Sequence, residues 1–346
     1  MISKTINLPN LLFLLLLLLV YQLIGQGELP KSKHYNLEKL ADGVYAAIHN
    51  DDGGFAICNG GIVNLGDRTV IIDPFISPTA ARDLKKHAEI LTGRPVSLVI
   101  NTHCHDDHTR GNQVFDPDAN IIGTPDARRS IERDFYKAVE SEKESSPKEL
   151  LNFQKWMEQA TDEEEKKELK MWCGYHQAKI ESFPELKMTP PNITITDTMT
   201  IWGTKREIVL IPTGIGHTTE DLIAYLPADS IIFMGDLLFV ERHPYMGGGD
   251  PASWKKTLQK IALLKPKIAV PGHGPVGDTN SIHVLIKYID TLTEMVNEEI
   301  KKGTNKDKIS ELPVPEEYKN WWFSGFYKWN TLKFLYNIAT AKANKD

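Results

Sequence analysis

Short apolar runs alternate with one amphipathic helix in the first part of the chain. The segment GGIVNLGDRTVIID, residues 60–73, contains two apolar stretches around a Gly-Asp turn signal and predicts a hairpin of two short strands. The segment AARDLKKHAEILTG, residues 80–93, has apolar residues at helical spacing, and Gly93 is its expected C-cap. VSLVINTH, residues 96–103, predicts a buried strand. Strand, helix, strand predicts a layered α/β architecture.

A comparable unit follows later in the chain. Its expected strands are REIVLIPT, LIAYLP, SIIFMGD and IAVPGHG, and its expected helix is PASWKKTLQKIALLK. Strands of the first unit end in Asp73 and His103, and strands of the second end in Asp236 and His273. Two similar halves whose strands end in polar residues predict a pseudo-duplicated fold with one site between the halves.

The region between the two units, residues 126–187, is charged and helical in pattern. A capping box from Ser146 to Glu149, with Pro147 at the first helical position, predicts a helix that begins at Ser146. One interpretation is a solvated helical arm. The other is a lid or a partner surface, which includes a homo-oligomer interface, because large apolar side chains would be costly to leave in water. These side chains are Trp156, Met157, Met171, Trp172 and Tyr175.

The C-terminal region, residues 286–346, predicts a helical extension. Its segment YKNWWFSGFYKWNTLKFLY is dense in aromatic residues. Because each ring buries a large apolar area, this density favours packing of the extension onto the main domain over ligand stacking.

Composition restricts the partners and the class of protein. The chain has 346 residues, with 40 basic and 46 acidic ones, and its formal net charge of −6 gives no reason to expect binding to nucleic acid. The three cysteines, Cys58, Cys104 and Cys173, are too few for a disulfide scaffold, although one bridge is compatible with this number.

The N-terminus, residues 1–27, has the pattern of a secretory signal peptide. Lys4 precedes the apolar run LLFLLLLLLV, and small residues follow at Gly25 and Gly27. The alternative is an uncleaved membrane anchor, although the run is short for a span. We expect an exported protein, periplasmic or secreted, with no stable membrane span after processing.

The stretch NTHCHDDHTRGN, residues 101–112, has the residues and spacing of a metal-binding loop. In an extended segment alternate side chains share a face, so His103 and His105 can point at one ion. If the chain then turns into a helix, Asp107 and His108 can point at a second ion nearby. Two metals roughly 3.5–4 Å apart can act together on a carbonyl or phosphoryl group. Further ligand candidates are His217 in GIGHTTED, Asp236 in FMGDLLF and His273 in PGHGP.

These motifs resemble the metallo-β-lactamase superfamily, which is marked by H-x-H-x-D-H, then G-H-T, G-D and P-G-H-G. The resemblance covers about residues 38–285 and implies a four-layer αββα sandwich, with residues 126–187 as an inserted helical arm. It implies two zinc ions per chain. One would be held by His103, His105 and His217, and the other by Asp107, His108 and His273, with Asp236 bridging both.

The resemblance also assigns supporting and catalytic roles. Asp73 resembles the strand-end aspartate that holds the metal loop. Asp107 is expected to orient the attacking hydroxide and to move its proton. Cys104, between two ligands, should point away from the metals and be buried and inert. In the commonest subclass of zinc β-lactamases a cysteine stands where this chain has Asp236, so the resemblance is closer to thioesterases and lactonases of the superfamily.

The expected function is therefore hydrolysis of an amide, ester, lactone or thioester, a β-lactam included, by a metal-bound hydroxide. Histidines at positions 103 and 105 favour zinc over iron. The alternatives are a metal-dependent phosphodiesterase and a non-catalytic protein whose metals only stabilise the fold. A small-molecule substrate would contact His243, which follows Asp236, and the arm residues Trp156 and Trp172.

Overall fold

The computed structural model describes residues 28–343, and residues 32–346 group into one compact unit. The predicted signal peptide, residues 1–27, lies outside the described residues. None of the helices in the described part of the chain is both long enough and apolar enough to cross a membrane.

The first sheet follows the chain order and has seven strands. Strands β1 to β4 pair antiparallel, and β4 to β7 pair parallel. The hairpin expected at residues 60–73 is confirmed as β3 and β4. The strands are β1 (Tyr35–Ala41), β2 (Val44–His49), β3 (Gly60–Asn64), β4 (Thr69–Ile72), β5 (Val96–Ile100), β6 (Asn120–Gly123) and β7 (Ile193–Thr194).

The second sheet has five strands in the order β12-β11-β10-β9-β8. In this sheet β11 and β12 pair parallel and the other neighbours pair antiparallel. The parallel pair β11 and β12 corresponds to the parallel pair β4 and β5 of the first sheet. The four strands expected in the second unit are confirmed. The strands are β8 (Met199–Trp202), β9 (Glu207–Gly214), β10 (Asp221–Leu226), β11 (Ile231–Phe233) and β12 (Ile268–Val270).

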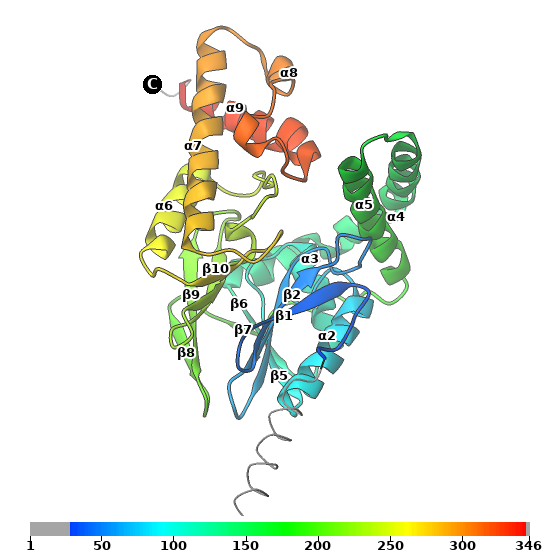
Figure 1. The fold of residues 1–346 in the computed structure, drawn as a ribbon, viewed down its shortest axis with the longest axis vertical. Helices are drawn as coiled ribbons and strands as arrows, with labels where there is room; N and C mark the ends of the chain where they lie inside the picture. Colours follow the sequence, from blue (N-terminus) through cyan, green and yellow to red (C-terminus); the bar gives the residue numbers. More distant parts are fainter. Residues whose placement is uncertain (1–27, 344–346) are drawn as a thin grey trace, which may run out of the picture. The chain divides into compact units, whose positions relative to one another are not determined.

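Helices cover the outer faces of both sheets, as Figure 1 shows, with α2 on one side and α6 and α7 on the other. The predicted αββα sandwich is therefore confirmed. Gly93 caps α2 in the left-handed conformation, with a φ of 69°. The helices are α2 (Pro78–Thr92), α3 (Asp106–Thr109), α4 (Pro125–Gln159), α5 (Glu163–Ser182), α6 (Pro251–Ala262), α7 (Thr279–Lys301), α8 (Lys306–Ile309) and α9 (Leu332–Ala343). Shorter helical turns are η1 (Arg110–Val114), η2 (Gly235–Leu237), η3 (Glu316–Tyr318) and η4 (Phe326–Thr331).

Two apolar cores hold these layers together. The first lies between the sheets and is built from strand residues such as Val63, Ile72 and Leu222. The second joins the outer face of the second sheet to α6, α7 and the C-terminal extension, and it includes Trp254 and Tyr288. Burial of these apolar surfaces is the main force that fixes the sandwich.

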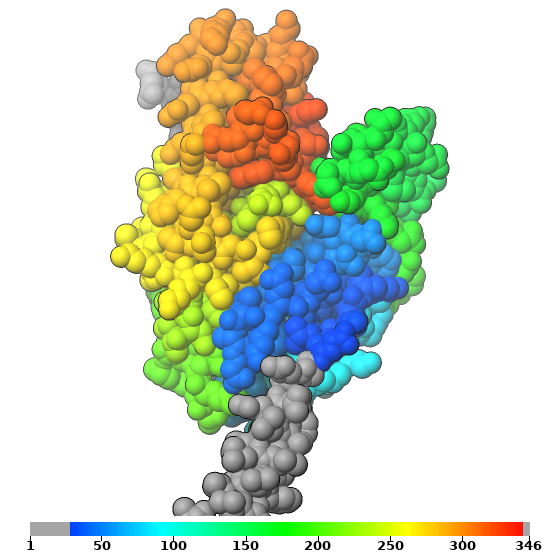
Figure 2. Space-filling model, viewed as in Figure 1, coloured from blue at the N-terminus to red at the C-terminus, as the bar shows by residue number. Residues whose placement is uncertain are grey.

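Helix α4 corrects the expectation of a helix start at Ser146. It runs without interruption from Pro125 to Gln159, with Pro147 in its interior, and its N-cap is Thr124. The proline removes one backbone hydrogen bond, but α4 packs along α5 and Ser146 is buried. Tertiary packing therefore outweighs the local start signal. Helices α4 and α5 form a hairpin, drawn in green in Figures 1 and 2, which we call the arm.

Candidate metal centre

The ends of four parallel strands deliver most of the polar residues expected at the site. Asp73 follows β4 and His103 follows β5, whereas Asp236 follows β11 and His273 follows β12. His217 comes from the loop between β9 and β10. Because both sheets present their strand ends at the same edge of the sandwich, residues far apart in the chain meet there, and Asp107 and His273 are separated by 166 positions.

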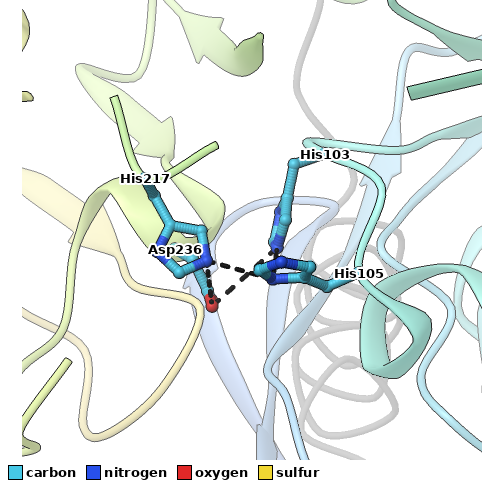
Figure 3. Close-up of side chains that lie close together, drawn as sticks. All are labelled: His103, His105, His217 and Asp236. Atoms are coloured by element: carbon cyan, nitrogen blue, oxygen red, sulfur yellow. Dashed lines mark hydrogen bonds and ion pairs between the residues drawn. The ribbon is translucent and has the colours of Figure 1, made fainter. Parts of the chain in front are cut away.

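The first cluster contains His103, His105, His217 and Asp236, which converge in Figure 3. The Nδ1 of His105 lies 3.1 Å from the Nε2 of His103 and 3.1 Å from the Nε2 of His217. The Oδ2 of Asp236 lies 3.2 Å from the Nε2 of His217. Imidazole nitrogens this close repel each other unless a proton or a cation lies between them.

The second cluster contains Asp107, His108 and His273. The Oδ2 of Asp107 lies 3.3 Å from the Nε2 of His273 and 3.5 Å from the Nε2 of His108. Asp236 also faces this cluster, because its Oδ1 lies 3.1 Å from the Nε2 of His108 and 3.3 Å from that of His273. The two oxygens of one carboxylate thus face two different groups of nitrogen donors.

Burial and neighbouring charges set the protonation of these groups. Burial lowers the pKa of His103 well below its ordinary value and lowers that of His217 to about 3. At His273 burial acts in the same direction, but the facing carboxylates, Asp236 first, outweigh it and raise the pKa to about 9. Burial of Asp236 is outweighed by the surrounding imidazoles, which hold its pKa well below the usual range. An ionised Asp236 and a neutral His217 are the forms that bind a cation.

Asp73 orients the loop that carries the ligands, residues 101–112, through contacts with Thr102 and His108. Its Oδ2 lies 2.8 Å from the Nδ1 of His108 and accepts a hydrogen bond from the hydroxyl of Thr102 at 2.7 Å, and its Oδ1 accepts from the Thr102 backbone N–H. The contact with Nδ1 fixes the ring of His108 so that Nε2 faces the second cluster.

Glycine is required next to Asp236. A Cβ at Gly272 would lie 1.9 Å from the Oδ1 of Asp236, a distance that no side chain tolerates. Gly274, on the other side of His273, has a φ of 94°, in the left-handed region that favours glycine. The two glycines therefore allow the His273 loop to approach the carboxylate closely.

The cysteines take no part in the two clusters. Cys104 is half-buried and faces a separate cavity beside Ser130, and burial raises the pKa of its thiol to about 11, so it is largely protonated at neutral pH. It belongs to neither ligand cluster, and it is less buried than expected. All three cysteines are free, so the single bridge that the count allows does not form.

A cavity of about 310 Å³ opens onto both clusters and is lined by Asp107, Asp236 and His273. Trp172, from α5, is part of its wall. Trp156 is not part of this wall; it is 47% exposed and lines a neighbouring cavity. Of the two arm tryptophans expected to contact a substrate, Trp172 therefore lines the cavity at the ligand clusters, whereas Trp156 lines only the neighbouring one.

The expectation that His243 lines the substrate pocket is also wrong. The residue is only 1% exposed and packs against Tyr288, Trp321 and Tyr327 in the core below the C-terminal extension. Its Nδ1 lies 2.9 Å from the hydroxyl of Tyr288, and burial lowers its pKa to about 4. Nearness to Asp236 in sequence is misleading here, because the ring of His243 packs among aromatic core residues and does not line the cavity at the ligand clusters.

Several residues at the site had no recognisable signal in the sequence. Asp221 is buried and accepts hydrogen bonds from the N–H and the hydroxyl of Thr218, which holds the His217 loop. Tyr245, Phe323 and Phe326 complete the wall of the metal cavity. The two phenylalanines belong to the aromatic C-terminal segment, for which packing alone was expected.

A buried network of charges connects the arm to the metal loop. Arg110 contacts Asp106 at 3.0 Å and Glu142 of α4 at 2.6 Å. Lys179 of α5 contacts Glu142 at 2.8 Å and Asp106 at 3.6 Å. Asp106 begins the helix that carries Asp107, so both arm helices are bonded to the segment that presents the second cluster.

The residues present fit a bound cation. Each cluster offers donor atoms within 4.8 Å of one another. The Nε2 of His108 and the Oδ1 of Asp236 are buried, and neither makes a hydrogen bond of good geometry with the described residues. Buried polar atoms without partners are costly, and a metal ion would satisfy both. Imidazole and carboxylate are the ligands that zinc prefers.

The chain belongs to the metallo-beta-lactamase superfamily, whose family model matches residues 53–273. Members of this superfamily are metal-dependent hydrolases. A type 2 metallo-beta-lactamase from Bacteroides fragilis is 27% identical over 128 residues, which cover 34% of this chain. The match spans about half of that relative, 51% of its length.

Solved structures share the fold. A metallo-beta-lactamase from Pontibacter korlensis superposes with a TM-score of 0.53 at 17% identity, over 74% of this chain and 99% of that one. The metallo-beta-lactamase FIM-1 from Pseudomonas aeruginosa, in a mono-zinc form, superposes with a TM-score of 0.53 at 16% identity, over 76% of this chain and 98% of that one. At this identity the likeness establishes the fold alone.

Proposed function

We propose that this chain is an exported hydrolase that uses two zinc ions to cleave a carbonyl substrate. The observation that carries the proposal is the position of Asp236, whose Oδ2 faces His217 and whose Oδ1 faces His108 and His273. A carboxylate between two groups of nitrogen donors suits a bridging ligand better than a structural zinc site, which is closed and usually holds one ion.

The ligand assignment follows from these distances. His103, His105 and His217 would hold one ion, and Asp107, His108 and His273 would hold the other. When bound, the zinc pair would lower the pKa of water from 15.7 to about 7 and polarise the substrate carbonyl. Asp107 lines the cavity as well as the second cluster, so its carboxylate is placed to orient a water molecule and to hold its proton.

The substrate class is a small molecule with an amide, ester, lactone or thioester bond. A cavity of about 310 Å³ is of the size of small-molecule sites. The relatives named above are β-lactamases, so a β-lactam belongs among the candidates. The aspartate at position 236, where the commonest zinc β-lactamases have a cysteine, favours an ester, lactone or thioester. Residues 1–27 would direct export.

Zinc analysis and a substrate screen test the proposal. The purified protein, dialysed against zinc and then desalted, should contain about two zinc ions per chain. It should hydrolyse at least one of three carbonyl probe classes, which are β-lactams, lactones and thioesters, and a phosphodiester is included as the contrasting probe. His103→Ala should reduce both zinc content and turnover, and Trp202→Ala, at an exposed position on β8, should change neither.

Each result bears on a different part of the proposal. Fewer than one zinc ion per chain after zinc repletion would refute the dinuclear site. Turnover of phosphodiesters alone would favour the phosphodiesterase alternative. Two zinc ions with no turnover in any class would favour a non-catalytic, metal-stabilised protein.

A further inference from the structure

A second and larger cavity lies between the arm and the C-terminal extension. Its volume is about 610 Å³, twice that of the cavity at the metal clusters. The arm contributes residues of α4 and α5, and the opposite wall is formed by residues 324–329. Figure 2 shows the arm, in green, meeting the C-terminal segment, in orange to red.

The two cavities adjoin each other. They share four wall residues, which are Trp172, Tyr175, Phe326 and Trp329. Trp172 packs between the two regions, with ring centroids 5.3 Å from Phe323 and 5.5 Å from Phe326. The larger cavity is therefore a direct neighbour of the cavity at the ligand clusters.

The contact between the arm and the C-terminal segment is fixed by a hydrogen bond. The Oε1 of Glu168, on α5, accepts from the backbone N–H of Phe323 at 2.8 Å. Met171, on the same helix, is fully buried in the core that includes the C-terminal extension. The larger cavity is thus formed by packed elements rather than by a free loop.

The lining of the larger cavity is aromatic and apolar. Phe153, Trp156, Leu169 and Trp329 line it, and no lysine or arginine does. His176 stacks on Phe153, and burial lowers its pKa to about 4, so its ring is neutral at pH 7. This surface suits a hydrocarbon or aryl group and offers no counter-ion to an anion.

The glutamates of the lining do not make it a cation site. Glu168 is engaged by the backbone of Phe323 and by the indole N–H of Trp172, and burial raises the pKa of its carboxyl. The lining also contains Glu149 and Glu165. Glu149 is partly exposed and Glu165 is exposed, so water screens the charges of both. A neutral apolar occupant therefore fits the cavity better than a cationic one.

We propose that the larger cavity binds the apolar tail, an alkyl or aryl group, of a substrate whose carbonyl lies at the metal clusters. The position of the carbonyl rests on the proposed function, whereas the affinity of the cavity for an apolar tail does not. The substrate class is thus narrowed to a neutral long-chain or aryl-substituted ester, lactone, thioester or amide. The arm and the C-terminal segment select the substrate together.

Two measurements separate the tail site from the chemistry. Binding of 1-butanol, 1-hexanol and 1-octanol, followed by ligand-observed NMR with zinc-free and zinc-loaded protein, should tighten about fourfold per methylene, which corresponds to about 0.8 kcal/mol. For ethyl esters from acetate to octanoate, KM should fall by a similar factor per methylene while kcat stays nearly constant. Equal affinity for the three alcohols would overturn the tail site and leave the proposed hydrolysis intact.

Variants identify the walls that bind the tail. Trp329→Ala and Leu169→Glu should each flatten the dependence of alcohol binding on chain length, because one removes an aromatic wall and the other places a charge in it. Trp202→Ala, which removes a tryptophan of similar exposure from β8, should keep the wild-type dependence. A wild-type dependence in both cavity variants would overturn the proposal. Octyltrimethylammonium binding more tightly than 1-octanol would indicate a cation site instead.

Discussion

The metal-ligand cluster is assembled from strand ends, whereas the aromatic cavity beside it is assembled from helix faces. His103 and His273 follow β5 and β12, which are held in register by their sheets. Trp156 and Trp172 lie on the arm, and Trp329 lies on η4. The metal-ligand cluster is held rigidly by the hydrogen bonds of two sheets. The aromatic cavity depends on the contact between the arm and the C-terminal extension.

The two regions also differ in burial and charge. His103, His217 and Asp236 are almost fully buried and face one another, whereas Trp156 and Trp329 are 47% and 55% exposed. A buried cluster of ligands tolerates almost no substitution, because each side chain balances the charge of the next. Substitution of a partly exposed aromatic residue in the cavity wall costs less stability. Under the two proposals above, chemistry and substrate choice are carried by separate parts of this chain.

The largest effect is expected where the two metal-ligand clusters join. Asp236→Ala should lose zinc, mainly from the second cluster, and reduce turnover by about 10³-fold or more, because the remaining imidazoles lose the carboxylate that offsets the repulsion of two cations. Zinc content and kcat/KM measure the two effects. The alcohol-binding series should stay unchanged in this variant. A loss of alcohol binding in parallel with zinc would show that the two regions are not separate.

Asp236→Cys sharpens the same comparison. Thiolate is a good zinc ligand, so at least one zinc should stay bound. If the ligand at position 236 alone set the substrate class, this variant would gain β-lactam hydrolysis. We expect no such gain, because the cavity walls are unchanged and specificity depends on differential binding of the transition state. A large gain in β-lactam turnover would contradict this expectation.

The sequence predicted one of these regions far better than the other. The ligands stand in short motifs at strand ends, and strand ends are readable because apolar runs of four to eight residues are local signals. The layered α/β architecture follows from the same runs, whereas the αββα arrangement was implied by the resemblance to the metallo-β-lactamase superfamily. The larger cavity could not be predicted, because it depends on the packing of α5 against residues 323–329, about 150 positions away along the chain.

The wrong predictions have the same cause. His243 follows Asp236 closely in sequence, but its ring enters the core against Tyr288. The sequence around Ser146 has the residues of a helix start, but the packing of α4 along α5 keeps the helix continuous through this position. The signal peptide, the domain limits and an oligomer through the arm stay predictions, as do the ligand roles.

The connection between the two regions is the next target. Lys179→Met removes the buried ammonium that contacts Glu142 and Asp106, and it should destabilise the fold by about 3–5 kcal/mol because two carboxylates are left with Arg110 alone. Urea unfolding measures this loss. Because Asp106 begins the helix that carries two ligands, zinc affinity should also fall by about tenfold.

An exposed pair on the same helix is the matched control. Lys167 and Glu164 contact each other at 2.6 Å with both side chains more than half exposed, so Lys167→Met should leave the free energy of unfolding nearly unchanged. Unchanged zinc affinity in Lys179→Met, with only the stability reduced, would mean that the network holds the arm without positioning the metal loop.

The smallest expected effect concerns His243, which lies in the core behind the metal cavity. Its pKa is lowered to about 4 by burial, against an ordinary value of 6.5, so the unfolded chain binds a proton at this residue before the folded chain does. The neutral ring contributes fully to stability above pH 6.5. This contribution is lost as the pH falls from 6.5 towards 4, and the free energy of unfolding falls by about 2 kcal/mol between pH 8 and pH 5.

His243→Gln cannot take up this proton. The variant should be less stable than the wild type at pH 8, since it loses packing against Tyr288, and the difference should shrink by about 2 kcal/mol at pH 5. Urea unfolding at the two pH values measures the difference, and His283→Gln, at an exposed position of α7, is the control that should show no such change. A constant difference between the wild type and His243→Gln at both pH values would mean that this imidazole is protonated in the folded core.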